Sequence, residues 1–381
     1  MKAGLIVAAI LISLATALVI QVTRDGELVI PEGADVITVG TDQFASFPLP
    51  EYVTNQLSIE YKSYFVEVEP GIKIHVLETG TGYPVLLQHG NPTTGLLYRK
   101  VVEALPIDKM RVILPTLVGL GFSSKVPASQ HTLANHIRWY GNLLDQLHLS
   151  EFIYAGQDWG GPIAMGAFAK SPGRLQGMVV LNTFFNAVTE PGDLSPGHRI
   201  AKRPIIGELI FELIISLFKN LPQTQGDPAS LPPETLALYA IPVEESDNAK
   251  APLGMMRMVP DGPKHPTTEH MQVIEQYVQN LEIPIEIVWG SKDPILASHL
   301  PAMRKNFPNA PITVTEAGHF LQEEVPNEIA SALERVLKQV QASLQESTKL
   351  VHMSGHTSYQ SNFKRMRDTG LMFMKNGISL F

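Results

Sequence analysis

A chain of 381 residues with 44% apolar and 17% charged residues has the composition of a folded globular protein, not of a disordered or coiled-coil one. Its formal net charge of −8 argues against a nucleic-acid partner, because phosphate binding needs a clustered basic surface. The chain contains no cysteine, which excludes disulfides, thiolate nucleophiles and zinc sites with cysteine ligands. The length suffices for one large catalytic domain with an insertion, or for two ordinary domains.

Residues 3–22 form an uncharged, mostly apolar run that ends before Arg24. About 20 such residues are enough to cross a bilayer as a helix, so residues 1–24 are interpreted as a membrane anchor or a signal peptide. Ala15 and Ala17 have the small-x-small spacing that signal peptidase accepts, whereas the run continues beyond them, which favours an uncleaved anchor. Both interpretations imply an exported protein that is membrane-anchored, periplasmic or extracellular. The remaining alternative is a buried core helix.

Residues 25–60 contain three prolines and no clear periodicity, and they are predicted to be a linker. Beyond them, short apolar or alternating runs typical of strands alternate with helical patterns. Such alternation predicts a mostly parallel sheet flanked by helices. The predicted strands are 62–68, 72–78, 84–88, 112–115, 152–156, 178–181, 285–289 and 312–314, and the clearest helices are 135–147, 160–170 and 327–344.

The alternation is interrupted once, between Phe184 and Glu282, by a Pro-rich segment with a helical pattern. A long segment between two buried strands that has helices of its own predicts a cap over the catalytic end of the sheet. The resulting domain boundaries are 61–183 and 282–345 for the core, 184–281 for the helical cap and 346–381 for a C-terminal extension. This basic extension is interpreted as a surface tail or, alternatively, as a membrane-facing or partner-binding segment.

The strongest chemical signal is Asp158. A buried strand, 152–156, leads into Gly156-Gln157-Asp158-Trp159-Gly160 and then into a helix, which is the strand–turn–helix context of a nucleophile elbow. Glycine on both sides relieves the clash of so tight a turn, and the central side chain stands at a helix N-terminus that favours negative charge. The alternative is an ordinary N-cap aspartate.

Three further motifs each follow a predicted strand. Asn91 lies in Gln88-His-Gly-Asn-Pro-Thr93, where a second N–H for an oxyanion is expected; Asp293 lies in Trp289-Gly-Ser-Lys-Asp-Pro294; and His319 lies in Glu316-Ala-Gly-His-Phe320. The order Asp158, Asp293, His319 is nucleophile, acid and base, as in an α/β-hydrolase. Each residue alone has an ordinary structural interpretation, but together they predict a catalytic triad.

With these motifs, residues 62–344 resemble a haloalkane dehalogenase of the α/β-hydrolase superfamily. The segments 89–93, 156–161, 289–294 and 318–326 carry the resemblance, and the cap segments 239–246 and 257–260 add to it. The resemblance implies an α/β-hydrolase fold: a mostly parallel eight-stranded sheet flanked by helices, with a helical cap inserted before the seventh strand.

The resemblance also implies roles for the site residues. Asp158 attacks an sp³ carbon to form an alkyl ester and release halide, the side chains of Asn91 and Trp159 bind the halide, and their backbone N–H groups form the oxyanion hole. His319 activates the hydrolytic water, and Asp293 orients His319. No tryptophan lies in the cap and Asn182 replaces the acid of another family variant, so the pattern is Asp-His-Asp with an Asn-Trp halide pair.

The expected ligands are a small haloalkane, water and the product halide, with no metal or cofactor. An apolar cap pocket is predicted from Phe184, Phe185, Leu236, Leu238, Met255 and Met256. One alternative is an epoxide hydrolase that uses Tyr239, with Tyr277 as an apparent second tyrosine. The others are a coelenterazine-type monooxygenase and a non-enzymatic binding protein, and only the site residues can separate them.

Overall fold

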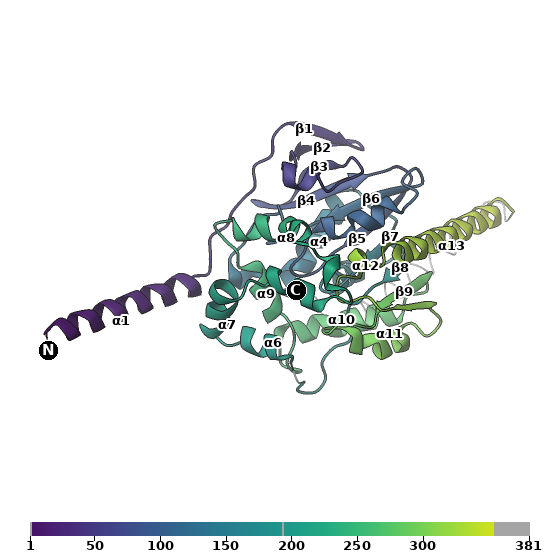
Figure 1. The fold of residues 1–381 in the computed structure, drawn as a ribbon. Coiled ribbons are helices and arrows are strands. Elements are labelled where there is room, and N and C mark those ends of the chain that lie inside the picture. The colour runs from purple at the N-terminus through teal and green to yellow at the C-terminus, as the bar shows by residue number, and fades with distance from the viewer. Residues whose placement is uncertain (1, 193, 354–381) are drawn as a thin grey trace.

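The computed structural model describes the backbone of residues 2–192 and 194–353 and the side chains of 11–192 and 194–346. At its centre is a ten-stranded sheet with the order β1-β2-β3-β4-β6-β5-β7-β8-β9-β10 (Figure 1). The strands from β6 to β10 in this order are parallel, and those from β1 to β4 are antiparallel. Their bounds are β1 Val36–Val39, β2 Asp42–Ser46, β3 Lys62–Glu69, β4 Ile72–Thr79, β5 Tyr83–Gln88, β6 Met110–Pro115, β7 Phe152–Gly156, β8 Leu175–Val180, β9 Ile285–Gly290 and β10 Ile312–Thr315.

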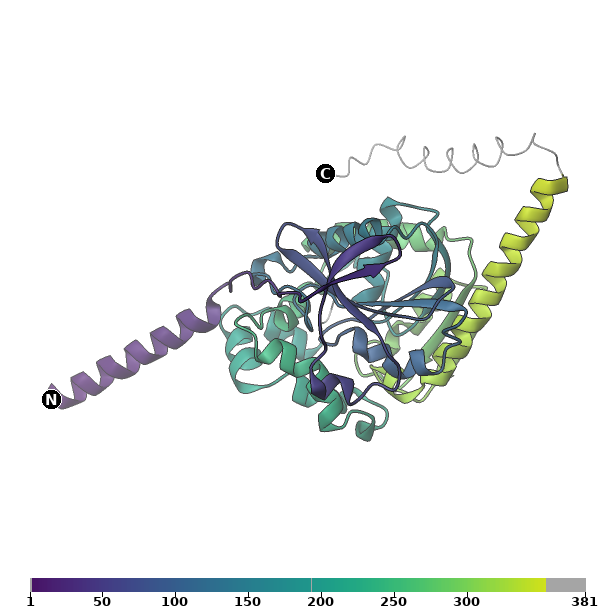
Figure 2. The same ribbon diagram turned by 90° about the horizontal axis from the view of Figure 1, so that it is seen from above.

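Helices cover both faces of the sheet, as the strand–helix alternation predicts. One face carries α4, α5 and α10, and the other carries α3, α12 and α13 (Figure 2). In α4 the buried residues recur at helical spacing, at Leu133, Ile137, Tyr140 and Leu144, which fixes the face that packs inward. The bounds are α3 Arg99–Glu103, α4 Leu133–Gln146, α5 Gly160–Lys170, α10 Pro266–Gln279, α11 Leu300–Asn306, α12 Leu321–Glu324 and α13 Pro326–Met353, with 3₁₀ turns η1 Gly95–Tyr98, η2 Ala128–Gln130 and η6 Ala297–His299.

The α/β-hydrolase fold predicted from the sequence is confirmed, with a sheet that is larger than expected. The eight predicted strands correspond to β3–β10. The linker prediction for 25–60 is wrong, because β1 and β2 form a hairpin that pairs with β3 and the short helix α2, Glu51–Thr54, follows it. These edge strands are short and half exposed, so they lack a strong alternation; Gly40, with φ of 62° in the connecting turn, is the signal that marks the hairpin.

The cap lies between β8 and β9, before the seventh of the eight predicted strands. Its elements are α6 Pro196–Ala201, α7 Ile206–Glu208, the π-helical segment η3 Leu209–Ile214, η4 Phe218–Thr224, η5 Pro228–Ser230, α8 Pro233–Glu244 and α9 Ala251–Arg257. The predicted cap, 184–281, extends too far, because α10 packs against α5 and α4 and belongs to the layer that covers the sheet.

Helices extend from the body at both ends of the described chain (Figures 1 and 2). Helix α1, Lys2–Thr23, meets the body at its C-terminal end, where Val22 is buried. Among the described residues, no helix combines the length and apolar character that crossing a bilayer requires. The anchor or signal peptide at 1–24 falls partly on side chains outside the described residues and stays a prediction. Helix α13 continues past residue 345, and most of the predicted extension, 354–381, lies outside the described residues.

Candidate active site

Asp158 stands at a sharp turn between β7 and α5. Its φ of 51° lies in the left-handed region that residues with side chains seldom adopt. Two hydrogen bonds hold the turn: the Asp158 N–H donates to the Asn182 carbonyl (2.8 Å), and the Thr183 hydroxyl donates to the Asp158 carbonyl (2.7 Å). Gly160 is required because a Cβ there would lie 2.6 Å from the His89 carbonyl oxygen. This is the geometry of a nucleophile elbow.

Two backbone N–H groups point at the Asp158 carboxylate. The Asn91 N–H donates to Asp158 Oδ1 over 2.8 Å, and the Trp159 N–H donates to the same carboxylate. Burial raises the pKa of Asp158, while the charge of His319 and these two hydrogen bonds oppose the rise. The pair of N–H groups is therefore placed to stabilise negative charge on an oxygen atom of Asp158.

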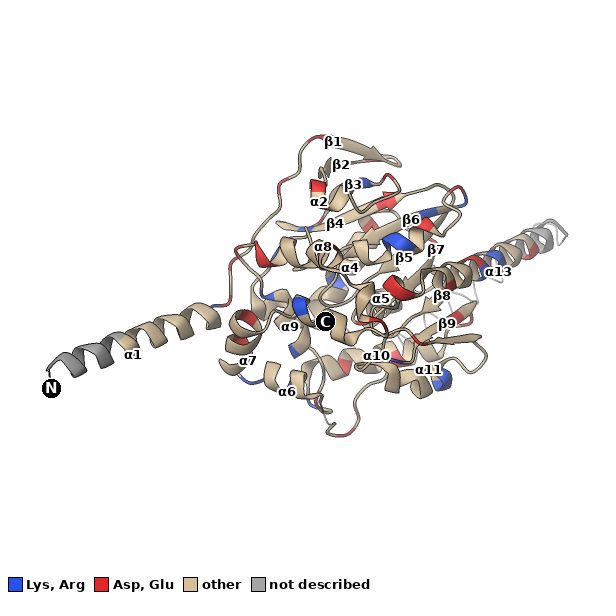
Figure 3. Ribbon diagram, in the orientation of Figure 1, with Lys and Arg blue, Asp and Glu red and all other residues tan. Residues whose placement is uncertain are grey.

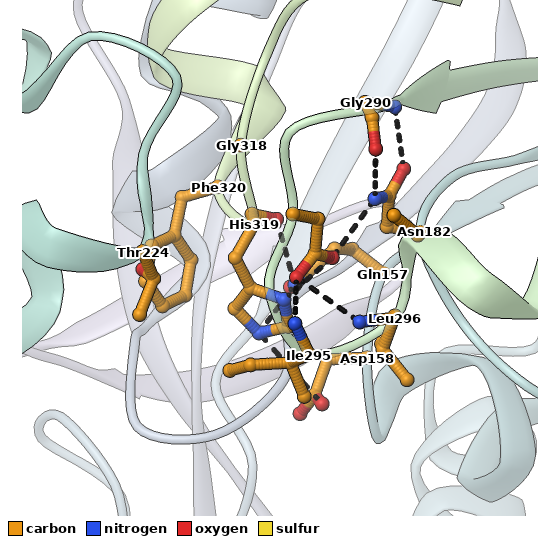
Figure 4. Close-up of polar contacts among 12 residues, drawn as sticks. Gln157, Asp158, Asn182, Thr224, Gly290, Ile295, Leu296, Gly318, His319 and Phe320 are labelled. Carbon is orange, nitrogen blue, oxygen red and sulfur yellow. Dashed lines mark hydrogen bonds and ion pairs between the residues drawn. The ribbon is translucent and has the colours of Figure 1, made fainter.

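His319 lies between the two aspartates, and Figure 4 shows its ring above Asp158. Its Nδ1 is 2.9 Å from Asp293 Oδ2, and its Nε2 is 3.9 Å from Asp158 Oδ2. Burial lowers the pKa of His319, but the charge and hydrogen bond of Asp293, together with Asp158, raise it overall. With Nδ1–H donated to Asp293, Nε2 carries the lone pair of the ring and lies on the Asp158 side, as a general base requires.

Gln157 is a site residue that the sequence did not single out. Its side-chain Nε2 lies 3.1 Å from His319 Nε2 and donates to the His319 carbonyl at 3.1 Å (Figure 4). An amide N–H only donates, so this contact favours the tautomer in which His319 Nε2 carries the lone pair. The residue precedes the nucleophile in the elbow, but nothing in the sequence indicates that its side chain turns toward the base.

Asp293 follows β9 in the chain and is buried, and both of its carboxylate oxygens accept hydrogen bonds. Its Oδ1 accepts from the N–H groups of Ile295 (2.7 Å) and Leu296 (3.1 Å), and its Oδ2 accepts from Asn182 Nδ2 (2.8 Å) and His319. Burial would raise the pKa of Asp293, but the charge of His319 and these hydrogen bonds lower it overall. Asn182, interpreted from sequence only as a missing acid, therefore orients the acid that is present.

The side chains of Asn91 and Trp159 line a cavity of about 650 Å³ beside Asp158. One N–H of the Asn91 amide donates to the Pro252 carbonyl in α9 (3.1 Å), and the amide has a second N–H for a ligand. The Trp159 ring packs edge-on against Phe184 with centroids 5.0 Å apart. Neither the amide nor the indole titrates, so both are suited to bind an anion that departs from a substrate carbon.

The cavity contains only two of the six predicted cap-pocket residues, Phe184 and Met256. Of the other four, Phe185, Leu238 and Met255 are buried in the core, and Leu236 is partly buried and packs against it. Adjacent residues on a helix point about 100° apart, and on α9 Met256 faces the cavity while Met255 faces the core. The described lining residues are Asn91, Pro92, Asp158, Trp159, Phe184, Asn186, Val188, Gly192, Leu194, Ser195, His198, Leu217, Asn220, Leu221, Thr224, Met256, Val259, Pro260, Pro294, Ile295, Leu296, Ser298, His299, His319 and Phe320.

Tyr239, the predicted cap tyrosine, lies outside the cavity. It is fully buried on α8, and its hydroxyl donates to Glu323 Oε1 over 2.6 Å. Glu323 also forms a buried ion pair with Arg99, so the hydroxyl joins a cluster that ties the cap to the core. Tyr277 lies on α10, and the described lining residues include no tyrosine. The structure therefore does not place these two tyrosines where an epoxide could reach them.

A polar residue that the sequence did not reveal, His198, reaches the cavity from α6. Its Nδ1 is 2.8 Å from the Ser195 hydroxyl. Burial lowers the pKa of His198, and the charge of Asp158 acts in the opposite direction, so a neutral imidazole stands near the carboxylate. Its position in the insertion, far from any strand end, gives no sequence signal. Within the described ranges, no group of three or more His, Asp or Glu side chains could hold a metal ion.

Comparison with known proteins gives the same fold. A family model for the alpha/beta hydrolase fold matches residues 83–202. The structure of the haloalkane dehalogenase DatA from Agrobacterium tumefaciens aligns with a TM-score of 0.66 and 26% identity, covering 76% of this chain and 100% of that one. The epoxide hydrolase CorEH aligns with a TM-score of 0.62 and 19% identity, covering 73% and 99%, which supports the fold alone.

Sequence relatives show which group within this fold the chain resembles. Haloalkane dehalogenase 2 from Mycobacterium tuberculosis is 30% identical over 272 residues, which cover 68% of this chain and 90% of the relative. A cis-3-alkyl-4-alkyloxetan-2-one decarboxylase from Shewanella oneidensis is 27% identical over 292 residues, covering 74% and 90%. The chain belongs to the α/β-hydrolase superfamily. Within it, the protein is a hydrolase related to the haloalkane dehalogenases.

Proposed function

We propose that this protein hydrolyses small haloalkanes to an alcohol, a halide and a proton. The observation that carries the proposal is the arrangement around Asp158: two non-titrating N–H side chains, Asn91 and Trp159, line the same cavity as its carboxylate. A halide leaves as a weak base and needs hydrogen bonds but no proton. A cavity with such donors and no described tyrosine fits that leaving group better than it fits an alkoxide.

In the first step, an oxygen of Asp158 attacks the carbon that bears the halogen, the carbon–halogen bond breaks, and an alkyl ester of Asp158 forms. In the second step, His319 takes a proton from water, and the oxygen of that water attacks the ester carbonyl carbon. The Asn91 and Trp159 N–H groups, which bind the carboxylate at rest, stabilise the oxyanion. Collapse releases the alcohol and restores the Asp158 carboxylate.

The test is halide and alcohol release from 1,2-dibromoethane or 1-iodobutane in weak buffer. Asp158→Ala should release no halide. His319→Ala should release halide once and retain the alkyl group, because the attack by Asp158 needs no base while hydrolysis does; intact-protein mass spectrometry detects the ester. His270→Ala, on α10 and outside the cavity lining, is the matched control. A His319→Ala protein that turns over normally would contradict the mechanism.

A second candidate is opening of a strained oxygen ring, either an epoxide or the oxetan-2-one of the Shewanella relative. His198 favours it, because an imidazole N–H in the cavity can donate a hydrogen bond to a developing alkoxide, which a halide does not need. Styrene oxide and a 3,4-dialkyloxetan-2-one should therefore be assayed beside the haloalkanes, for diol and for carbon dioxide. If His198→Ala abolishes ring opening and spares halide release, the cavity serves both reactions; diol or carbon dioxide without halide would replace the first proposal.

We also propose that residues 1–24 direct the protein out of the cytoplasm and hold it at a membrane. The uncharged run at 3–22 supports this. Carbonate extraction of cells that express the full chain, compared with a chain starting at Gly26, tests it. Recovery of both forms in the soluble fraction would contradict it.

A further inference from the structure

One cap segment, residues 205–215, exposes apolar side chains to the solvent. Ile214 is 70% exposed and Leu213 is 49% exposed, and Ile205, Ile206 and Ile215 are also exposed. Single exposed apolar residues are common, but five within eleven residues form a patch of the kind that marks a binding surface.

The charged residues of the same segment point the other way. Glu208 pairs with Arg257 at 2.8 Å, and Glu212 pairs with Lys250 at 2.6 Å. Both bases belong to α9 and the turn before it, so these ion pairs lie between the segment and the rest of the cap. The segment therefore has its charges inward, where they are neutralised, and its apolar side chains outward, the reverse of an ordinary surface helix.

The backbone of the segment is also unusual. Ile205 has a φ of 68°, a conformation that is costly for a β-branched residue and persists only when the surrounding structure enforces it. Gly207 meets Ala201 so closely that a Cβ would lie 2.6 Å from its carbonyl oxygen, and residues 209–214 form a π-helix. Such features concentrate at functional sites, and here they occur in the segment that exposes the apolar side chains.

The patch continues onto α1. Helix α1 ends beside α7 and η3 in both ribbon views (Figures 1 and 2), and Lys250 Nζ donates to the Val22 carbonyl at 2.7 Å while it pairs with Glu212. The described part of α1 shows no charged residue in Figure 3, and its exposed side chains include Leu14, Leu18 and Ile20.

Basic residues flank this surface. Arg203 and Lys219 are exposed on either side of 205–215. An apolar stripe bordered by Lys and Arg is the pattern of segments that lie in the headgroup region of an anionic bilayer.

We propose that residues 205–215 rest in the interfacial region of a lipid bilayer, beside α1, and form a second membrane contact. Leu217 follows the segment and lines both the active-site cavity and the cavity next to α1. The contact therefore places one wall of the active site at the lipid surface. This part of the proposal rests on the proposed function: apolar haloalkanes dissolved in the bilayer enter the active-site cavity through the wall that contains Leu217.

The chain has no cysteine, so a single introduced cysteine can carry an environment-sensitive fluorophore such as NBD. Ile214→Cys is the test position in the full chain. Val36→Cys, a 65% exposed position on the edge strand β1, is the matched control. Vesicles of phosphatidylcholine with phosphatidylglycerol should shift the emission at 214 to the blue and increase its intensity, and leave the emission at 36 unchanged.

Two results would overturn the proposal. In the first, the protein co-sediments with vesicles but the emission of the fluorophore at position 214 stays as it is in water. That result would mean that α1 alone contacts the lipid. The other is a shift that appears without vesicles and grows with protein concentration, which would mean that a second copy covers the patch.

A double variant, Leu213→Asp with Ile214→Asp, should weaken vesicle partitioning about tenfold or more, because it replaces two solvent-exposed apolar side chains of the proposed lipid contact with charged ones. Val36→Asp with Val314→Asp is its control. Turnover of water-soluble haloalkanes should be the same in both. Absence of halide release would bear on the proposed chemistry alone, since the fluorescence reports lipid contact whether or not the protein is active.

Discussion

The carboxyl edge of the sheet and the cap contribute to the same cavity by different physical routes. At the sheet edge, each site residue follows a strand and is held by backbone hydrogen bonds, as Asp293 is by the N–H groups of Ile295 and Leu296. In the cap, the residues that face the cavity are selected by the rotation of short helices. The first kind of position is encoded locally, and the second depends on how helices pack together.

This difference in how side chains are positioned explains why reaction chemistry and substrate range are expected to depend on different regions. A side chain fixed by its strand end keeps its place when its neighbours change, so reaction chemistry is concentrated there. A cap residue can be brought into the cavity or removed from it by a small rotation of its helix, so substrate range is expected to vary there.

The largest expected effect lies at the sheet edge. Asp293→Asn keeps the shape of the side chain but removes the charge that fixes the His319 tautomer, and it should lower turnover by about 10⁴-fold. Asn182→Ala removes only one of the donors to Asp293 and should cost far less. Steady-state halide release measures both. Equal losses in the two variants would mean that Asn182 does more than orient Asp293.

Sequence reasoning succeeded where local signals were strong. It located the eight strands β3–β10, and the structure brings Asn91, Asp158, Trp159, Asp293 and His319 together because all of them follow strands or lie in the elbow. It missed the β1–β2 hairpin, whose short half-exposed strands have little pattern. The sequence did not predict Gln157 and His198 as site residues, because the direction of a side chain in a turn and the placement of a helix in a cap depend on tertiary packing.

Met255 and Met256 are neighbours on α9, and they test how the rotation of a cap helix assigns one side chain to the core and the next to the cavity. Met255 is fully buried, so Met255→Ala should cost about 2–5 kcal/mol in the free energy of unfolding. Met256 lines the cavity, so Met256→Ala should have a smaller effect on stability and change KM for longer haloalkanes. Urea denaturation and substrate-length profiles test the pair. The reverse result would mean that α9 is rotated from its described position.

Tyr239→Phe separates a structural role from a chemical one. Loss of the hydrogen bond to Glu323 should destabilise the protein by about 1.5–3 kcal/mol, because the acceptor is charged and buried. Turnover of haloalkanes and of epoxides should not change. Tyr140→Phe is the control, since among the described residues the buried Tyr140 hydroxyl has no partner, and it should be close to neutral. Loss of epoxide turnover in Tyr239→Phe but not in Tyr140→Phe would mean that Tyr239 takes part in ring opening.

The pH dependence tests whether Asp293 acts on His319 as the geometry indicates. His319 must be neutral to take a proton from water, and in the free protein the charge and hydrogen bond of Asp293, together with the charge of Asp158, raise its pKa above the ordinary value of 6.5. In the alkyl ester Asp158 carries no charge, so only Asp293 of these two raises the pKa of His319, and hydrolysis should be lost as the pH falls through that pKa. In the residual activity of Asp293→Asn that limb should move to lower pH, because the charge of Asp293 then no longer offsets burial, which lowers the pKa of His319. Formation of the ester uses Asp158 alone and should not follow the same limb, so rapid-quench measurement of the two steps separates them. A limb that stays in place in Asp293→Asn would assign it to another group, and His198 in the cap would be the next residue to vary.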